Sequence, residues 1–168
     1  MKLFKADMCA YCDYANISGL SVLRLLFMRY FYVIMLIRLQ SLENKLIIPI
    51  KFISKVILSM LFHIEVASKC KIGPGLILPH PQNIIIGASS IGEGCIIMAN
   101  VTIGAKLPDP SFTESLRPDI GSNVLLGVGS CVIGAISIGD NCKVGALSLV
   151  SGSVSENKTI VGFNTIIS

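Results

Sequence analysis

The sequence predicts a mainly β protein in which a parallel β-helix of hexapeptide repeats follows an N-terminal α-helical segment. An aliphatic residue recurs at every sixth position over residues 66 to about 162, a small or aliphatic residue follows four places later, and two apolar stretches precede the repeats. A length of 168 residues allows one domain, or one domain with a helical appendage. We therefore expect a helical segment at 1–63 and a β-helix at 64–168.

The repeat is clearest from Ile120 onward. There the chain reads I-G-S-N-V-L, L-G-V-G-S-C, V-I-G-A-I-S, I-G-D-N-C-K, V-G-A-L-S-L and V-S-G-S-V-S. A period of six, with a glycine or turn former after most aliphatic positions, suits short flat strands joined by tight corners. Each aliphatic side chain is then expected to point inward onto its counterpart in the next coil. A sandwich of short strands would show period-two alternation instead, and we reject it.

Two interruptions divide the repeats. The six-residue spacing of aliphatic residues reaches Leu78, and the next aliphatic position, Ile85, comes seven residues later instead of six. From Ile85 the spacing of six continues to Ile103. From Ile103 to Ile120 the gap is 17 residues, which no whole number of repeats fills. The segment 106–119 contains three prolines and no repeat, so we expect a loop that leaves the β-helix there.

The N-terminal segment predicts two helices, at about 20–39 and 46–62, separated by the polar residues 40–45. Neither stretch supplies the roughly eighteen uncharged apolar residues of a spanning helix, and Arg29 would cost roughly 2.5–3.5 kcal/mol at a bilayer centre. A membrane-spanning helix is therefore disfavoured. Two alternatives stay open: the helices pack on each other, on the β-helix or across a subunit interface, or they lie on a membrane face.

The charge is unevenly distributed. Residues 21–62 contain six basic side chains against one acidic side chain, a balance of +5, whereas residues 63–168 sum to −1. Lys51 and Lys55 share one helix face, as a basic edge facing lipid requires. No aromatic and basic interleaving supports nucleic-acid binding. With no secretory cleavage signal, we expect a cytoplasmic protein, either free or peripheral at the inner face of the cell membrane.

Six cysteines raise the question of metal or disulfides. Four are scattered singly through the repeats, where a small apolar side chain suits a narrow core: Cys70, Cys95, Cys131 and Cys142. Cys9 and Cys12 form one Cys-x-x-Cys pair, but neither a second pair nor histidines at matching spacing follow. We therefore expect no metal site.

The chain has only two histidines. His63 lies at the junction between the helices and the repeats, and we expect it to be structural. His80 lies between Pro79 and Pro81, just before the phase slip, which is a poor place for a core residue. An ordinary surface position is the alternative, but a solvent-facing imidazole on a rigid corner suits the deprotonation of an alcohol.

Longer motifs carry a resemblance to a known family. From Ile64 the chain reads I-E-V-A-S-K-C-K-I-G-P-G-L-I-L-P-H, and from Ile91 it reads I-G-E-G-C-I-I-M-A-N-V-T-I-G-A. After the loop follow R-P-D-I-G-S-N-V-L-L-G-V-G and I-G-D-N-C-K-V-G-A. These motifs, over about residues 64–162, resemble the hexapeptide acetyltransferases, in the branch of the serine acetyltransferases and the capsule and exopolysaccharide O-acetyltransferases. The resemblance implies left-handed coils, a homotrimer or a dimer of trimers, and acetyl-CoA bound between subunits.

The same resemblance implies site residues. The base of that branch matches His80, and the carboxylate that holds it stands fifteen residues earlier, where this chain has Glu65. Glu65 would fix the imidazole tautomer and stabilise the imidazolium; a plain surface carboxylate is the alternative. The oxyanion donor of the family matches the segment Gly104-Ala105, with Ala105 as the expected donor. The thioester and pantetheine contacts would lie at Gly104, Ala105, Gly127, Val128 and Ala146.

Departures from the serine enzymes bear on the acceptor. The resemblance implies an Asp directly before the base, which binds the ammonium group of the amino acid in the serine enzymes; this chain has Pro79 there. It also implies a second histidine at the position of Arg117. Arg117 would instead orient a sugar carboxylate or phosphate. We therefore expect an acetyl-CoA-dependent O-acetyltransferase acting on a sugar hydroxyl of a capsular or exopolysaccharide precursor, free or lipid-linked.

Other functions stay open beside this expectation. The first alternative is serine O-acetyltransferase, and the second is a non-catalytic β-helix scaffold. A metal-dependent β-helix hydratase is disfavoured, because it needs three histidine ligands and the chain has two.

Overall fold

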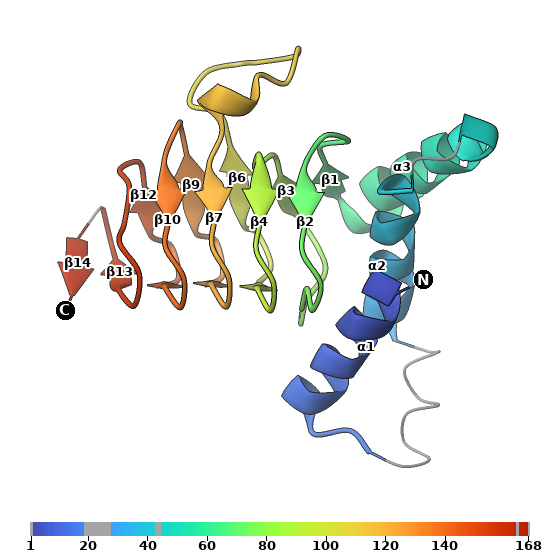
Figure 1. Cartoon of the computed structure of the whole chain (residues 1–168), viewed down its shortest axis with the longest axis horizontal. Helices are drawn as coiled ribbons and strands as arrows, with labels where there is room; N and C mark the ends of the chain where they lie inside the picture. The colour runs from blue at the N-terminus through green and yellow to red at the C-terminus, as the bar shows by residue number, and fades with distance from the viewer. Residues whose placement is uncertain (1, 19–27, 43–44, 164, 168) are drawn as a thin grey trace.

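In the described part of the chain, the helices lie at one end of a solenoid of short strands, whose coils stack along the long axis of the molecule (Figure 1). This computed structural model describes residues 2–18, 28–42, 45–163 and 165–167. The helices are α1 (Lys2–Ala15), α2 (Arg29–Gln40) and α3 (Ile48–Phe62), and the 3-10 helix η2 (Lys45–Ile47) leads into α3.

The helical segment has one more helix than the sequence predicts. α3 occupies the stretch expected at 46–62, and α2 covers the later part of the stretch expected at 20–39, of which residues 20–27 lie outside the described residues. α1 was not expected. Its only fully buried residue is Asp7, but Phe4, Met8 and Tyr11 recur at helical spacing and pack, partly buried, against the core. This short stripe is a signal of the helix that the sequence-based expectation missed.

The strands form three parallel sheets, which the chain visits in turn. The first sheet contains β1 (Ile64–Val66), β3 (Ile84–Ile86), β6 (Thr102–Gly104), β9 (Cys131–Ile133) and β12 (Leu149–Val150). The second contains β2 (Lys71–Ile72), β4 (Ser90–Ile91), β7 (Asp119–Ile120) and β10 (Ser137–Ile138). The third contains β5 (Ile96–Ile97), β8 (Leu125–Leu126), β11 (Lys143–Val144) and β13 (Thr159–Val161), with β14 (Thr165–Ile167) antiparallel at its edge.

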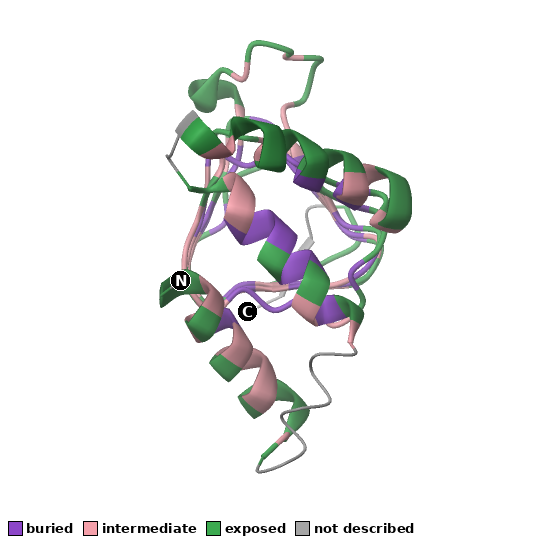
Figure 2. Cartoon of the chain, turned by 90° about the vertical axis from the view of Figure 1, so that its right-hand side faces the viewer, coloured by how far each residue is buried: buried purple, intermediate pink, exposed green. Residues whose placement is uncertain are grey.

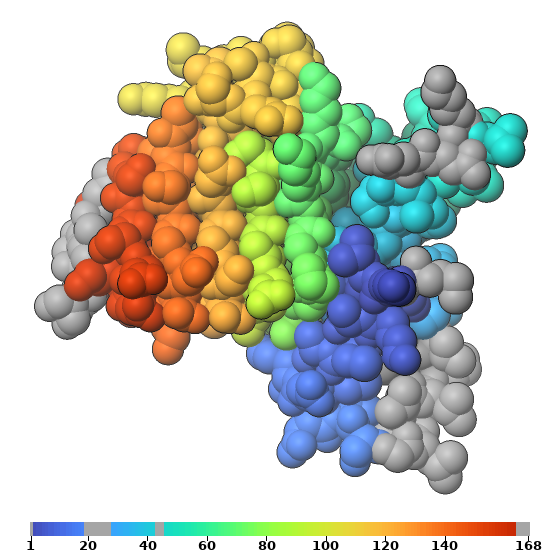
Figure 3. Space-filling view, in the orientation of Figure 1, coloured from blue at the N-terminus to red at the C-terminus, as the bar shows by residue number. Residues whose placement is uncertain are grey.

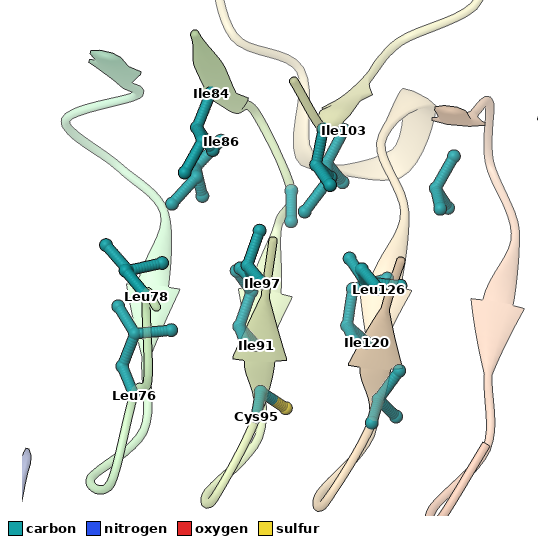
Figure 4. Close-up of a cluster of buried hydrophobic side chains, with 14 of the residues drawn as sticks. Leu76, Leu78, Ile84, Ile86, Ile91, Cys95, Ile97, Ile103, Ile120 and Leu126 are labelled. Atoms are coloured by element: carbon teal, nitrogen blue, oxygen red, sulfur yellow. The ribbon is translucent and has the colours of Figure 1, made fainter. Parts of the chain in front are cut away.

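This arrangement is typical of a left-handed β-helix and confirms the predicted fold class. We name the corners by the sheets they join: the first corner leads from the first sheet to the second, the second corner from the second to the third, and the third corner from the third back to the first. Leu78, Ile97 and Leu126 fill the interior of successive coils (Figure 4). Repeated aliphatic positions therefore build one continuous core.

One predicted position is wrong. Ile85 was expected to point inward, but it is 44% exposed, and the buried residues of β3 are Ile84 and Ile86. Ile86 pairs with Val66 in the coil before and with Ile103 in the coil after. From Val66 to Ile86 the chain takes 20 residues, and from Ile86 to Ile103 only 17. Three consecutive isoleucines hide the phase of a strand, because a shift of one residue exchanges its faces.

Asparagines shape two of the corners. Five of them adopt the left-handed backbone conformation that turns the chain sharply: Asn83, Asn100, Asn123, Asn141 and Asn157. Asn83 donates a side-chain hydrogen bond to Asn100 at the third corner (3.0 Å), and Asn141 donates one to Asn157 at the second corner (3.1 Å). The corners of successive coils are thus tied to each other by side chains as well as by the backbone.

The helices cover the open edge of the first coil, so packing on the β-helix, one of the arrangements left open by the sequence, is observed. α2 crosses this end of the solenoid with its buried side against it (Figure 2), and α1 packs against the outside of the first coil (Figure 3). Arg38 of α2 donates to the carbonyl oxygens of Ile72 (2.8 Å) and Gly73 (2.7 Å), and Asp7 of α1 accepts from the Leu76 amide (2.9 Å). Backbone groups that would otherwise be open to strand addition are therefore satisfied.

Helices and solenoid share one hydrophobic core. Tyr30, Ile34 and Leu58 belong to the same buried cluster as Leu76 and Leu78 of the first coil. The expected division at residues 63 and 64 stays a prediction. Among the helices in the described part of the chain, none combines the length and apolarity that crossing a bilayer requires.

Candidate active site

The third corner lines up several of the predicted site residues. The Asn100 amide donates to the Gln82 carbonyl (3.2 Å), and the Leu147 amide donates to the Val128 carbonyl (2.9 Å). Between these two pairs, Gly129 donates to Ala99 (3.0 Å). Four successive coils are joined in this way, and the spacing of about 4.8 Å between neighbouring strands makes the column roughly 14 Å long. The structure thus brings His80, Gly127, Val128 and Ala146 to one edge of the solenoid.

His80 is exposed on a corner that is held firmly to the end of α3. The Asn83 amide donates to the Phe62 carbonyl (3.1 Å), and the Ile84 amide donates to the His63 carbonyl (3.2 Å). His63 ends α3 in a left-handed conformation at φ 52°, which accords with the structural role expected for it. The two prolines on either side of His80 restrict the backbone further. The imidazole is therefore presented to solvent from a rigid support.

Glu65 lies at the centre of β1 and points outward. Glu65 pairs across the sheet with Ile85, which lies in the strand that opens the second coil. His80 lies on the corner just before that strand. The two predicted partners therefore both belong to the first coil. Within the described residues, no hydrogen bond or ion pair joins Glu65 to His80. The His80–Glu65 dyad stays a prediction.

A hollow of about 390 Å³ lies beside His80. It is lined by the corner residues 79–82 together with Tyr11, Met28, Arg29 and Tyr30 from the helical segment. Tyr11 stacks on Tyr30 with ring centroids 3.8 Å apart. Among the described residues that line the hollow, Arg29 is the only one with a permanent charge, and none is acidic. No sequence pattern indicates that the helical segment contributes to this wall.

Tyr30 forms the floor of this hollow. Its hydroxyl lies 2.9 Å from the carbonyl oxygen of Asp7 and 2.8 Å from that of Leu76. Burial, with the negative charge of Asp7 as a smaller cause, raises the pKa of Tyr30 above its usual range. The hydroxyl therefore stays protonated and serves as a structural donor between helix and coil.

The predicted cofactor contacts of the third corner differ in their hydrogen bonds. The Gly127 amide donates to the Val144 carbonyl (2.8 Å), and a Cβ at Gly127 would come within 2.7 Å of the Ala146 nitrogen. Gly127 is therefore needed for the close approach of two coils. In the part of the chain that the structure describes, the amides of Val128 and Ala146 donate to no backbone carbonyl. Both residues are exposed, so these two amides are available to a ligand.

Gly104 and Ala105 lie at the first corner, across the first sheet from His80. A Cβ added to Gly104 would meet nothing within 4 Å, so the packing of one subunit does not require glycine there. Ala105 lines a second hollow of about 360 Å³, beside the loop after β6. Its amide makes no backbone hydrogen bond among the described residues. One subunit alone does not bring the predicted oxyanion donor to the predicted base.

Arg117 anchors the loop that leaves the solenoid. Its guanidinium donates to the Asp109 carboxylate (3.1 and 3.2 Å), to the Asp109 carbonyl (2.8 Å) and to the Gly87 carbonyl (3.0 Å). The same group lies 4.1 Å from the centroid of the Phe112 ring. These contacts engage the guanidinium within the loop, and its expected contact with the acceptor stays a prediction. The sequence did not reveal Asp109 or Phe112 as its partners.

The cysteines carry no sign of chemistry. Cys95 and Cys142 are buried in the solenoid, and all six thiols are free. Burial raises the pKa of Cys95 to about 11, which keeps the thiol protonated. Among the described residues, no cluster of three or more metal-ligating side chains occurs.

Comparisons with known proteins agree with the repeat and with the fold. Residues 119–146 match the family described as "Hexapeptide repeat of succinyl-transferase". A serine acetyltransferase of Helicobacter pylori is 35% identical over 100 residues, which cover 59% of this chain and 57% of the relative. A serine acetyltransferase of Staphylococcus aureus is 37% identical over 100 residues, which cover 59% of this chain and 46% of the relative. Over the solenoid the chain is thus similar to hexapeptide-repeat acetyltransferases.

The solved structures that the chain resembles are serine acetyltransferases. A solved structure of the enzyme from Neisseria gonorrhoeae in complex with serine has a TM-score of 0.83 at 24% identity and covers 99% of this chain and 68% of that protein. The Brucella abortus enzyme in complex with coenzyme A has a TM-score of 0.83 at 23% identity, with coverage of 99% and 67%. At such identities the structures show a shared fold. The chain spans only about half the length of the sequence relatives that it matches.

Proposed function

We propose that this protein is an acetyl-CoA-dependent O-acetyltransferase with His80 as its general base. The observation that carries the proposal is the column at the third corner, where an exposed, rigidly held imidazole lies in line with the available amides of Val128 and Ala146. The sequence relatives are named serine acetyltransferases, and one structure of that fold holds coenzyme A. Acetyl-CoA is therefore the donor that the site fits.

The reaction requires few groups. His80 takes the proton of the acceptor hydroxyl as its oxygen attacks the thioester carbonyl, and Glu65 holds the imidazole and stabilises the imidazolium. The negative charge on the carbonyl oxygen is stabilised by the Ala105 amide. When the carbon–sulfur bond breaks, the imidazolium returns its proton to the leaving thiolate. The products are the acetyl ester and the free thiol of coenzyme A.

This arrangement requires more than one subunit. His80, Val128 and Ala146 lie at the third corner, whereas Gly104 and Ala105 lie at the first corner, and the first sheet separates them. A homotrimer would place the third corner of one subunit against the first corner of the next, and three equivalent sites would result. We therefore infer a homotrimer, with a dimer of trimers as the alternative.

Two acceptors remain, and different observations favour them. The names of the relatives favour L-serine. The hollow beside His80 favours a sugar hydroxyl, because among the described residues that line it Arg29 carries the only permanent charge and no carboxylate is present to bind an ammonium group. Pro79 occupies the place of the family's ammonium-binding Asp. We propose the sugar hydroxyl of a surface-polysaccharide precursor as acceptor, and free L-serine as the second candidate.

An acetyl-CoA consumption assay tests both the activity and the acceptor. The wild-type chain is offered L-serine, a panel of nucleotide-sugars and lipid-linked oligosaccharides. We expect turnover of a sugar acceptor, and a loss of roughly 10²- to 10⁴-fold on His80→Ala, the contribution typical of a general base. His63→Asn is the matched control, because it removes the other imidazole and asparagine tolerates the left-handed backbone there.

Several outcomes would overturn parts of the proposal. Turnover of L-serine alone would replace the sugar by the second candidate. Failure to turn over any acceptor, together with failure to bind coenzyme A, would favour the non-catalytic scaffold. If His63→Asn lowered the rate as much as His80→Ala, the assignment of the base would be wrong.

A further inference from the structure

α3 presents an apolar face to solvent. It packs on the rest of the molecule through one narrow stripe, in which Ser54 and Leu58 are buried. Phe52 and Met60 are 69% and 72% exposed, and α3 lies across the end of the molecule with most of its surface uncovered (Figure 2). A surface helix of a globular protein shows the opposite pattern, with its polar side outward.

The exposed side chains form a continuous face. Phe52, Val56 and Met60 follow one another at four-residue spacing, and two residues separate this row from the buried stripe. Two residues correspond to about 200° of rotation, so the row points directly away from the protein. Further large exposed side chains widen it: Leu46, Ile48, Ile50, Ile53 and Leu61. We call residues 48, 50, 52, 53, 56, 60 and 61 of α3, together with residue 46 of the preceding η2, the outer face of α3.

Its charge is of one sign only. Lys51 and Lys55, one helical turn apart, lie along one edge of the outer face, and residues 45–62 contain no aspartate or glutamate. A lysine at such an edge can extend its ammonium group toward lipid headgroups while its methylene chain stays on the apolar surface. The combination of an outward apolar row and a basic edge is typical of a helix that lies in a membrane interface.

We propose that the outer face of α3 docks on an anionic lipid bilayer. A second copy of this chain fits the face less well, because face-to-face packing would bring two lysine edges together and α3 supplies no carboxylate to neutralise them. A helix of 15 residues is roughly 22 Å long, so it lies in the interface rather than crossing the bilayer. The membrane contact does not depend on the acetyl-transfer chemistry.

Docking would also bring the candidate site to the membrane. The His80 corner belongs to the first coil, and its last residues donate hydrogen bonds to the carbonyl oxygens of Phe62 and His63, where α3 ends. The candidate base therefore lies at the membrane end of the solenoid. This consequence, which rests on the proposed function, favours an acceptor sugar carried on a lipid over one free in solution.

Vesicle flotation of the full chain tests the proposal. We expect binding to vesicles of phosphatidylcholine and phosphatidylglycerol, weaker binding to phosphatidylcholine alone, and release as the salt concentration rises. Phe52→Ser with Met60→Ser should weaken binding at least tenfold. Lys51→Gln with Lys55→Gln should weaken it about 25-fold on anionic vesicles only, since each lysine near the surface contributes roughly a factor of five.

Leu107→Ser is the matched control, because Leu107 is 76% exposed but lies on the loop after β6. It should bind as the wild type does. Each variant is also tested for acetyl transfer to a soluble acceptor, which the α3 substitutions should leave unchanged, so a folding defect or a failure of the proposed activity is recognised separately. Equal binding by the α3 variants, or no binding by the wild type, would overturn the proposal. A wild-type hexamer that Phe52→Ser with Met60→Ser converts to trimers would assign the face to a second copy instead.

Discussion

At the scale of single residues, the ion pair between Asp7 and Arg38 joins the two parts of the chain. The Arg38 guanidinium donates to both carboxylate oxygens, at 2.7 and 2.8 Å, and the pair is almost fully buried, with residue exposures of 0% and 6%. Both groups are also bonded to the backbone of the first coil, so no hydrogen-bonding group of the carboxylate is left without a partner. A buried pair of this kind fixes the relative position of α1, α2 and the coil.

We predict that Asp7→Ala lowers the free energy of unfolding by about 3–5 kcal/mol, because it leaves the Arg38 guanidinium buried without a counter-charge. Asp13→Ala, which removes an exposed carboxylate of the same helix, is the control and should change it by less than about 0.5 kcal/mol. The double change Asp7→Leu with Arg38→Met should recover part of the loss, since an apolar pair needs no compensation. Urea denaturation at fixed protein concentration measures all three. Equal losses for Asp7→Ala and Asp13→Ala would contradict the prediction.

The sequence predicts residues unevenly at this scale. His80 is predicted from its place between two prolines, and Glu65 from its spacing to His80. Asp7 is not predicted, because nothing in its sequence neighbourhood distinguishes it from an exposed charged residue. Its partner is 31 residues away, and no periodic pattern connects the two. Arg29 and Tyr11 are missed for the same reason, because only the packing of the helices against the first coil brings them to the hollow beside His80. Contacts between separate elements leave no local trace in the sequence.

At the scale of elements, the loop between β6 and β7 is organised around Asp109. Its carboxylate accepts from the Thr113 amide (2.6 Å), from the Ser111 hydroxyl (2.8 Å) and from Arg117, while Arg117 in turn reaches the Gly87 carbonyl of the solenoid. The Thr113 hydrogen bond, with smaller effects from the Ser111 and Arg117 side chains, holds the pKa of Asp109 below its usual value of 3.8. The loop is therefore ordered by an ionised carboxylate.

We predict that this order is lost only in strong acid. A carboxyl whose pKa is lowered on folding contributes its full stabilisation above the unfolded pKa and loses it as the pH falls through the folded pKa, which here lies below 3.8. Hydrogen exchange of peptides from residues 106–119, corrected for the intrinsic rate, should thus be constant from neutral pH to about pH 5 and rise below pH 3.8. Asp109→Asn should remove the protection at neutral pH.

Glu114→Gln is the control for this prediction, because its carboxylate lies in the same loop but is exposed and makes only a 4.0 Å contact with Lys71. It should leave the exchange of the loop unchanged. Protection that persists in Asp109→Asn would show that the loop is held by its apolar contacts rather than by the carboxylate.

Elements differ in how far the sequence predicts them. The solenoid is predictable because each coil repeats the same inward aliphatic position, and the break after Ile103 reveals the loop by its prolines. The predicted inward position of Ile85 is wrong for two reasons. The third corner of the first coil contains extra residues, and the strand is uniformly apolar, so hydrophobicity cannot distinguish its two faces. α1 was not predicted, because its apolar stripe of Phe4, Met8 and Tyr11 is short and only partly buried, and its one fully buried residue is the charged Asp7.

At the scale of the whole molecule, the proposed site is divided between two corners. Gly104 has open space where a side chain would be, although its backbone does not need glycine, and this accords with the close approach of something outside its own subunit. The Ala105 amide and the amides of Val128 and Ala146 are likewise available on separate edges of one solenoid. Under the proposed function, the site would be complete only when a second copy supplies the other corner.

We predict that two inactive variants restore each other's activity. His80→Ala removes the proposed base at the third corner, and Gly104→Phe places a bulky side chain at the first corner, where a Cβ meets no atom of its own subunit within 4 Å. If each site takes one corner from each of two neighbouring subunits, co-expressed subunits in equal amounts recover about a quarter of wild-type acetyl transfer, because one random interface in four joins two intact corners. Tandem affinity tags isolate the mixed oligomers, and light scattering gives their size. If the site lay within one subunit, every subunit of the mixture would carry a defect and the activity would stay at the level of the single variants.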